Sequence, residues 1–216
     1  MSNNFDPNQN HYIYIEKDTT PLMFIHGVGL DHQMWDPQID NLKEFSTITY
    51  DLLGHGKTPC KKDKLSLNDF SNQLINILEH LKIDKIHLIG FSLGSLIALD
   101  FVSKIQNKVD KLILIGTTYK RTIEERSLVI DRYNQAKLNK PISKQALKRW
   151  FTDKYLEENP KTYDSFMNIL NKNSVDHKNF LKAYELFANH EDNIPLIQGI
   201  SSKTLVMTGS DDPGST

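Results

Sequence analysis

The residue with the clearest chemical potential is Ser92, which lies between two glycines in a Gly-x-Ser-x-Gly pattern at residues 90–94. An apolar, β-branched run precedes the pattern and an apolar run follows it, which predicts a buried strand, a sharp turn and a buried helix. Such a turn strains its apical residue and crowds the positions two before and two after it, so Gly90 and Gly94 suit it. Ser92 is therefore a candidate nucleophile, and the alternative is a serine that caps an ordinary helix.

Short apolar runs alternate with helical patterns along much of the chain, and these elements must position the serine. Ser66 and Asp69, for example, form a capping pair ahead of apolar residues at helical spacing. Strands that alternate with helices imply a mostly parallel sheet with right-handed crossovers. The predicted fold class is therefore α/β, with a mostly parallel, doubly wound sheet. Its strands are predicted at residues 12–15, 22–25, 47–50, 85–89, 112–115 and 204–207.

The alternation of strands and helices stops after residue 118. From there to about residue 190 the sequence is highly charged and helical, without a clear strand, which predicts a helical cap inserted into the core. We therefore predict three regions. The first part of the core spans residues 1–118, the cap spans residues 119–192, and residues 193–216 return to the core.

The composition excludes several classes of partner. A net charge of −1 over 216 residues gives no electrostatic basis for binding nucleic acid or an anionic membrane, and favours a small neutral or weakly charged substrate. The single cysteine, Cys60, excludes an internal disulfide. No export signal and no membrane-spanning apolar run is present, so a cytoplasmic protein is expected. The eight histidines show no ligand spacing, so no metal is expected. The oligomeric state stays open.

Three motifs follow one another: His-Gly-Val-Gly at residues 26–29, Asp-Leu-Leu-Gly-His-Gly at residues 51–56, and the serine pattern at residues 90–94. A weaker fourth motif, Gly-Ser-Asp-Asp, occupies residues 209–212. With these motifs the chain resembles the α/β-hydrolases that carry a helical cap, in particular small esterases, 3-oxoadipate enol-lactonases and cofactor-free haloperoxidases or perhydrolases. The resemblance runs from about residue 12 to the end of the chain and implies that no cofactor is needed.

The resemblance implies a catalytic role for four residues. Ser92 is the nucleophile, and the backbone N–H groups of Val28 and Leu93 form the oxyanion hole, which stabilises negative charge on the attacked carbonyl oxygen. Asp212 is the acid that orients the catalytic base, and its neighbour Asp211 is a solvated residue.

Glycines and histidines of the first two motifs have structural roles in this resemblance. Gly27 and Gly29 allow the loop after the predicted strand at residues 22–25 to approach the serine closely. Related proteins use histidines in such glycine-rich turns to brace loops by hydrogen bonds. His26 and His55 are therefore expected to be braces and not catalytic bases.

The reaction implied by the resemblance is hydrolysis of a small carboxylic ester, lactone or thioester through an acyl-enzyme. In this fold the base is a histidine that comes after the acid in the chain, and no histidine follows Asp212. We therefore expect an inactive fragment that lacks the last strand and helix, with the strand at residues 204–207 as an unprotected edge. Two alternatives stay open: a hydrolase of carbon–carbon bonds with the same machinery, and a ligand-binding relative without catalysis.

Overall fold

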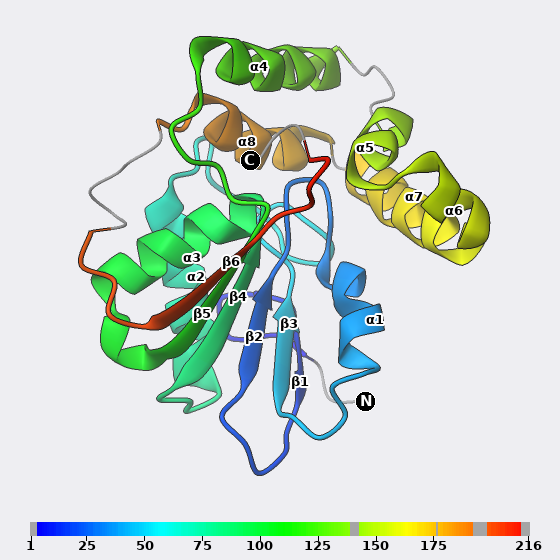
Figure 1. Cartoon of the computed structure of the whole chain (residues 1–216). Helices are drawn as coiled ribbons and strands as arrows, with labels where there is room; N and C mark the ends of the chain where they lie inside the picture. The colour runs from blue at the N-terminus through cyan, green and yellow to red at the C-terminus, as the bar shows by residue number, and fades with distance from the viewer. Residues whose placement is uncertain (1–3, 139–142, 176, 192–197, 213–216) are drawn as a thin grey trace.

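The computed structural model describes residues 4–138, 143–175, 177–191 and 198–212. Its centre is a six-stranded sheet with the order β1-β3-β2-β4-β5-β6. Strand β1 pairs antiparallel with β3, and the other neighbouring strands pair in parallel. The predicted mostly parallel sheet is thus confirmed (Figure 1). The strands are β1 (Tyr12–Ile15), β2 (Leu22–Ile25), β3 (Thr47–Tyr50), β4 (Ile86–Phe91), β5 (Val109–Ile115) and β6 (Lys203–Met207).

The side chains of β2 show why both faces of the sheet are covered. Successive residues of a strand point to opposite faces. Met23 and Ile25 belong to the apolar core that contains residues of α2 (Leu67–His80) and α3 (Leu93–Lys104). Phe24 instead belongs to a second core with Trp35, at the end of the 3₁₀ helix η1 (His32–Trp35) and just before α1 (Asp36–Ile39). The sheet therefore has apolar layers on both sides, as the doubly wound prediction requires.

The start of α2 follows the predicted capping pattern. The Ser66 side chain accepts a hydrogen bond from the Asp69 N–H, and the Asp69 carboxylate accepts one from the Ser66 N–H. These two bonds satisfy backbone donors that have no partner within the helix. The helix then presents Phe70, Leu74 and Ile77 to the sheet, all fully buried.

In the described part of the chain, five helices come between β5 and β6, and they lie across one end of the sheet (Figure 1). The helical pattern of the sequence predicts four of them, centred on residues 127–137, 144–151, 163–170 and 179–188. It does not predict the short α6, which only six residues form. The Thr152 side chain caps α6 by accepting from the Tyr155 N–H. The predicted return to the core at residue 193 lies outside the described residues. The helices are α4 (Ile123–Lys137), α5 (Ser143–Trp150), α6 (Asp153–Glu158), α7 (Pro160–Val175) and α8 (His177–Asn189).

Strand β6 is the last strand at one edge of the sheet, and each of its residues is exposed. Leu205, Val206 and Met207 are 52%, 60% and 48% exposed. This agrees with the unprotected edge predicted for residues 204–207. None of the helices in the described part of the chain is both long enough and apolar enough to cross a membrane.

Candidate active site

Ser92 occupies the turn between β4 and α3, at the end of the sheet that faces the five helices (Figure 1). Its backbone has φ 54° and ψ −116°, a strained conformation for a residue with a side chain. The Ser92 N–H donates to the Ile115 carbonyl at 2.9 Å, which holds the turn against β5. The side chain forms no capping hydrogen bond with α3. The alternative of a helix-capping serine is therefore wrong.

Gly90 and Gly94 are needed because the strand and the helix approach each other closely around Ser92. A Cβ atom on Gly90 would lie 2.3 Å from the Gly94 carbonyl oxygen. A Cβ atom on Gly94 would lie 2.4 Å from the Ile25 carbonyl oxygen of β2. In both cases the obstructing atoms belong to the backbone, which cannot move aside like a flexible side chain. The two glycines thus allow the sharp turn that the sequence predicted.

The loop after β2 reaches the same turn. A Cβ atom on Gly27 would lie 3.3 Å from the Cβ of Ser92, so the backbone of this loop passes beside the serine. Val28 is the next residue of the loop. Leu93 is the first residue of α3, where a backbone N–H has no acceptor within the helix. Two segments far apart in the chain therefore meet at the turn, and an oxyanion hole formed by the N–H groups of Val28 and Leu93 stays a prediction.

His26 and His55 brace the loops around the turn. His26 Nδ1 lies 2.8 Å from the Gly27 carbonyl oxygen, and its Nε2 accepts from the Leu52 N–H at 2.9 Å. His55 Nδ1 lies 3.2 Å from the Leu53 carbonyl oxygen, and its Nε2 accepts from the Gly29 N–H at 3.1 Å. Both nitrogens of each ring are thus engaged with backbone. The predicted bracing role is confirmed.

Burial keeps both bracing histidines neutral. It lowers the pKa of His26 to about 3, with a further lowering by His55, and it lowers the pKa of His55 to about 4. A neutral imidazole whose Nε2 already accepts a backbone hydrogen bond has no free lone pair for a proton from Ser92. Neither ring is therefore placed to act as the general base.

Asp51 is the centre of a second buried cluster, which the sequence did not indicate. Its carboxylate accepts from His11 Nδ1 at 2.9 Å, from His32 Nδ1 at 2.7 Å and from the backbone N–H groups of His32 and Lys57. Burial alone would raise the pKa of the Asp51 carboxyl, but these donors hold it well below its usual range. The ring and carboxylate atoms lie within 4.8 Å of one another, a spacing that a metal ion could use. Four donors already saturate the carboxylate, so hydrogen bonding accounts for the cluster.

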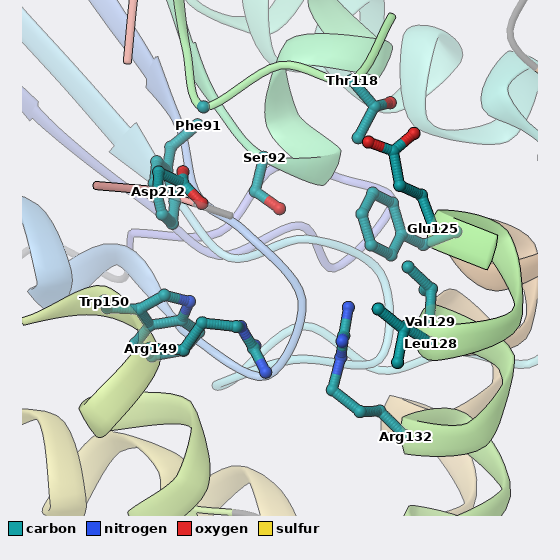
Figure 2. A pocket seen from close by; sticks show the side chains of 12 residues that line it. Phe91, Ser92, Thr118, Glu125, Leu128, Val129, Arg132, Arg149, Trp150 and Asp212 are labelled. Atoms are coloured by element: carbon teal, nitrogen blue, oxygen red, sulfur yellow. The ribbon is translucent and has the colours of Figure 1, made fainter. Parts of the chain in front are cut away.

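Ser92 and Asp212 line one cavity of about 130 Å³ between the sheet and the helices above it (Figure 2). Asp212 follows β6 and is half-buried, whereas Asp211 is exposed. The structure thus brings together two of the predicted residues that are 120 positions apart in the chain. The described lining contains no histidine. It consists of Phe91, Ser92, Gly116, Thr118, Glu125, Leu128, Val129, Arg132, Arg149, Trp150, Phe187 and Asp212.

Two residues of this lining were missed by the sequence analysis. Arg132 belongs to α4 and Arg149 to α5, and both side chains extend into the space in front of Ser92 (Figure 2). Each arginine stands among other charged residues of surface helices, and the two are separated by a helix end and a loop. No local pattern could therefore distinguish them from solvated charges.

A serine in a strained turn after a central parallel strand, with helices over the carboxyl end of the sheet, defines the class of α/β hydrolases. The chain belongs to the α/β-hydrolase fold family, whose model matches residues 20–215. The (E)-2-((N-methylformamido)methylene)succinate hydrolase of Acinetobacter baylyi is 30% identical over 213 residues, which make up 97% of this chain and 79% of that protein.

Solved structures agree with this assignment of the fold. The enol-lactonase from Burkholderia xenovorans has a TM-score of 0.83 at 22% identity, covering 93% of this chain and 78% of that one. A thermophilic esterase from Thermogutta terrifontis, solved with malate bound, has a TM-score of 0.82 at 23% identity, covering 96% of this chain and 79% of that one. The succinate hydrolase, the enol-lactonase and the esterase are all hydrolytic enzymes.

Proposed function

We propose that this chain carries the nucleophile and acid of a serine hydrolase that acts on a carboxylic ester, lactone or thioester. The observation that carries the proposal is the Ser92 side chain, which is held in a strained turn, forms no helix cap and lines a cavity together with Asp212. The similarity to a hydrolase that acts on an N-methylformamido-methylene succinate supports hydrolysis as the type of reaction.

In this proposal a general base takes the hydroxyl proton of Ser92 as its Oγ attacks the acyl carbon, and the carbonyl π electrons move to the oxygen. N–H groups of Val28 and Leu93 stabilise that oxyanion. When the carbonyl re-forms, the alcohol or thiol leaves with a proton from the base, and an acyl-Ser92 ester remains. Water then attacks the acyl-enzyme and releases the acid. Asp212 holds the base in one tautomer and stabilises its protonated form.

None of the described residues of this site is placed to act as the general base. The two described histidines that brace the neighbouring loops are fully engaged, and the described lining of the cavity has none. Without a base a serine hydroxyl is a poor nucleophile at neutral pH. We therefore propose that the isolated chain turns over substrate very slowly. The same observation favours a second candidate, a binding protein that uses the cavity without catalysis.

Imidazole added to the solution provides a test, since it can act as an external general base. We expect Ser92 to react with a fluorophosphonate probe, and p-nitrophenyl acetate hydrolysis to rise with imidazole beyond the reaction of imidazole alone. Ser92→Ala is expected to abolish both signals. Ser103→Ala, on the exposed side of α3, is the matched control and should retain them.

The two candidates give different results in this experiment. Imidazole-dependent labelling and turnover that need Ser92 support the hydrolase. A folded chain that is not labelled at Ser92 at any imidazole concentration contradicts the hydrolase and favours the binding protein. Turnover that survives Ser92→Ala would show that another residue is responsible.

A further inference from the structure

Two guanidinium groups enter the cavity from different helices of the cap. Figure 2 shows Arg132 and Arg149 converging on the space in front of Ser92, with the Trp150 ring beside them. Arg149 also lines an adjoining, more open hollow along residues 207–212. Both arginine residues are half-buried, so they are partly removed from the water that normally solvates such charges. Two cations placed at one cavity next to a candidate nucleophile need a counter-charge.

The described residues do not supply that counter-charge fully. Neither guanidinium forms an ion pair with a carboxylate of the described chain. Arg132 Nε is buried and has no hydrogen-bond acceptor in the described structure, and Thr118 Oγ1 on the cavity wall has no partner there either. Buried polar groups without partners are rare in folded proteins and often mark a ligand site. Both atoms therefore point to a polar ligand.

Other charged groups around the pair do not replace such a ligand. The Glu125 carboxylate accepts from the Thr122 N–H at 2.6 Å and helps to cap α4. Asp212 lies near enough to Arg149 to favour its charged form, but it shares the cavity with Ser92, where the proposed function needs it. The Tyr184 side chain hydrogen-bonds Arg132 but is neutral: burial raises the pKa of its hydroxyl, and the charges of the two guanidinium groups offset only part of this rise.

The two arginines also repel each other. Burial lowers the pKa of the Arg149 guanidinium, and the like charge of Arg132 lowers it further. An anion placed between the two groups would relieve this repulsion and accept hydrogen bonds from both. Guanidinium groups match the planar carboxylate especially well, because two parallel N–H donors can reach its two oxygens.

We infer that Arg132 and Arg149 bind a free carboxylate of the substrate, so that the substrate is an ester, lactone or thioester that also carries an acid group. The carbonyl that reacts lies at Ser92, and the free carboxylate lies toward the cap. The cavity has a volume of about 130 Å³, small for a ligand site, which favours a short acid such as a half-ester of a dicarboxylic acid. The position of the reacting carbonyl rests on the proposed function, whereas anion binding does not.

Binding of simple dicarboxylates tests the inference without any need for turnover. Isothermal titration of the full chain is carried out with malonate, succinate, glutarate and adipate, and with the neutral diamide of each. We expect at least one dicarboxylate to bind and its diamide not to bind. Arg132→Gln and Arg149→Gln are each expected to weaken the binding by about 10-fold or more, as for other hydrogen bonds to charged groups.

Matched controls come from the same helices. Arg126→Gln on α4 and Lys144→Gln on α5 remove a positive charge outside the cavity lining and should leave the affinity within about twofold. Circular dichroism melting of each variant checks that it is folded. The inference is wrong if no dicarboxylate binds to the folded chain, if the diamides bind equally well, or if both arginine variants bind like the unmodified chain. Tighter binding of inorganic phosphate than of any dicarboxylate would also overturn it.

Ser92→Ala separates this inference from the proposed function. The variant is expected to bind the dicarboxylate as the unmodified chain does, since the anion contacts come from the cap. If dicarboxylates bind but Ser92 is never labelled, the hydrolase proposal fails and the anion site stands. If Ser92 is labelled but dicarboxylates do not bind, the anion site fails and the hydrolase stands.

Discussion

The two neutral histidines that brace the active-site loops predict that the fold loses stability in mild acid. His26 and His55 are fully buried, and burial lowers their pKa values from 6.5 to about 3 and about 4. Below pH 6.5 the unfolded chain binds a proton at each position, while the folded chain does not. Because the unfolded state then binds more protons, the free energy of unfolding falls as the pH falls through this range.

The size of the effect follows from these values. Between pH 7 and pH 5 each histidine lowers the free energy of unfolding by about 2 kcal/mol, so the two together lower it by about 4 kcal/mol. The figure depends little on the folded pKa values, since both lie well below pH 5. His32 acts in the opposite direction: hydrogen bonding to Asp51 outweighs its burial and raises its pKa, so it stabilises the fold as the pH falls below its folded value.

His55→Gln isolates one of the two contributions. A glutamine oxygen can still accept from the Gly29 N–H, but it cannot be protonated in this range. Urea denaturation at pH 7 and at pH 5 gives the free energy of unfolding of each chain. We expect the loss between the two pH values to be smaller by about 2 kcal/mol in the variant. Since His32 is present in both chains, its contribution cancels.

His80→Gln is the matched control, because His80 is exposed at the end of α2. This variant should keep the pH dependence of the unmodified chain. If His55→Gln and His80→Gln show the same loss of stability between pH 7 and pH 5, the bracing histidine is not held neutral in the fold and the reasoning is refuted.

Three further predictions concern the turn, the buried carboxylate and the sheet edge. Gly94→Ala places a Cβ atom 2.4 Å from a backbone oxygen of β2. It should cost about 3 kcal/mol and lower the melting temperature by roughly 6–12 °C. At Gly209 an added Cβ atom would have no heavy atom nearer than 3.9 Å, so Gly209→Ala should change the melting temperature little. Equal melting temperatures of the two variants would contradict the close approach at Gly94. Asp51→Asn leaves buried donors mismatched, so it should lower the free energy of unfolding, measured by urea denaturation, by about 3–5 kcal/mol. Asp18→Asn, at an exposed position, should change this free energy hardly at all. If Asp51→Asn lowered the free energy of unfolding only slightly, the contacts of the Asp51 carboxylate would not be needed for stability. The exposed edge strand is expected to cause self-association in sedimentation velocity, and Val206→Lys, which puts a charge on it, should reduce this association. Equal association of the two chains would contradict a role of the edge.

Much of the fold could be predicted because it depends on short-range patterns. The apolar runs of β1, β2 and β3 have the bounds that alternation and turn residues predicted. The capping pair Ser66 and Asp69 marks the helix start, since a side chain three residues away can reach the free N–H groups. The site serine is equally local: only glycine fits at two positions around it. The six-residue helix α6 was missed because so short a segment has no clear period.

The sequence by itself thus determined the sheet, the sharp turn after β4 and the serine that the turn presents. Only the tertiary structure decided what surrounds that serine. Asp212 and the arginine pair of α4 and α5 reach one cavity through the packing of segments far apart in the chain. The cluster around Asp51 likewise joins His11 and His32 from separate loops. Such contacts depend on how whole helices and loops pack on the sheet, and no spacing along the sequence encodes the distance between two side chains brought together in this way.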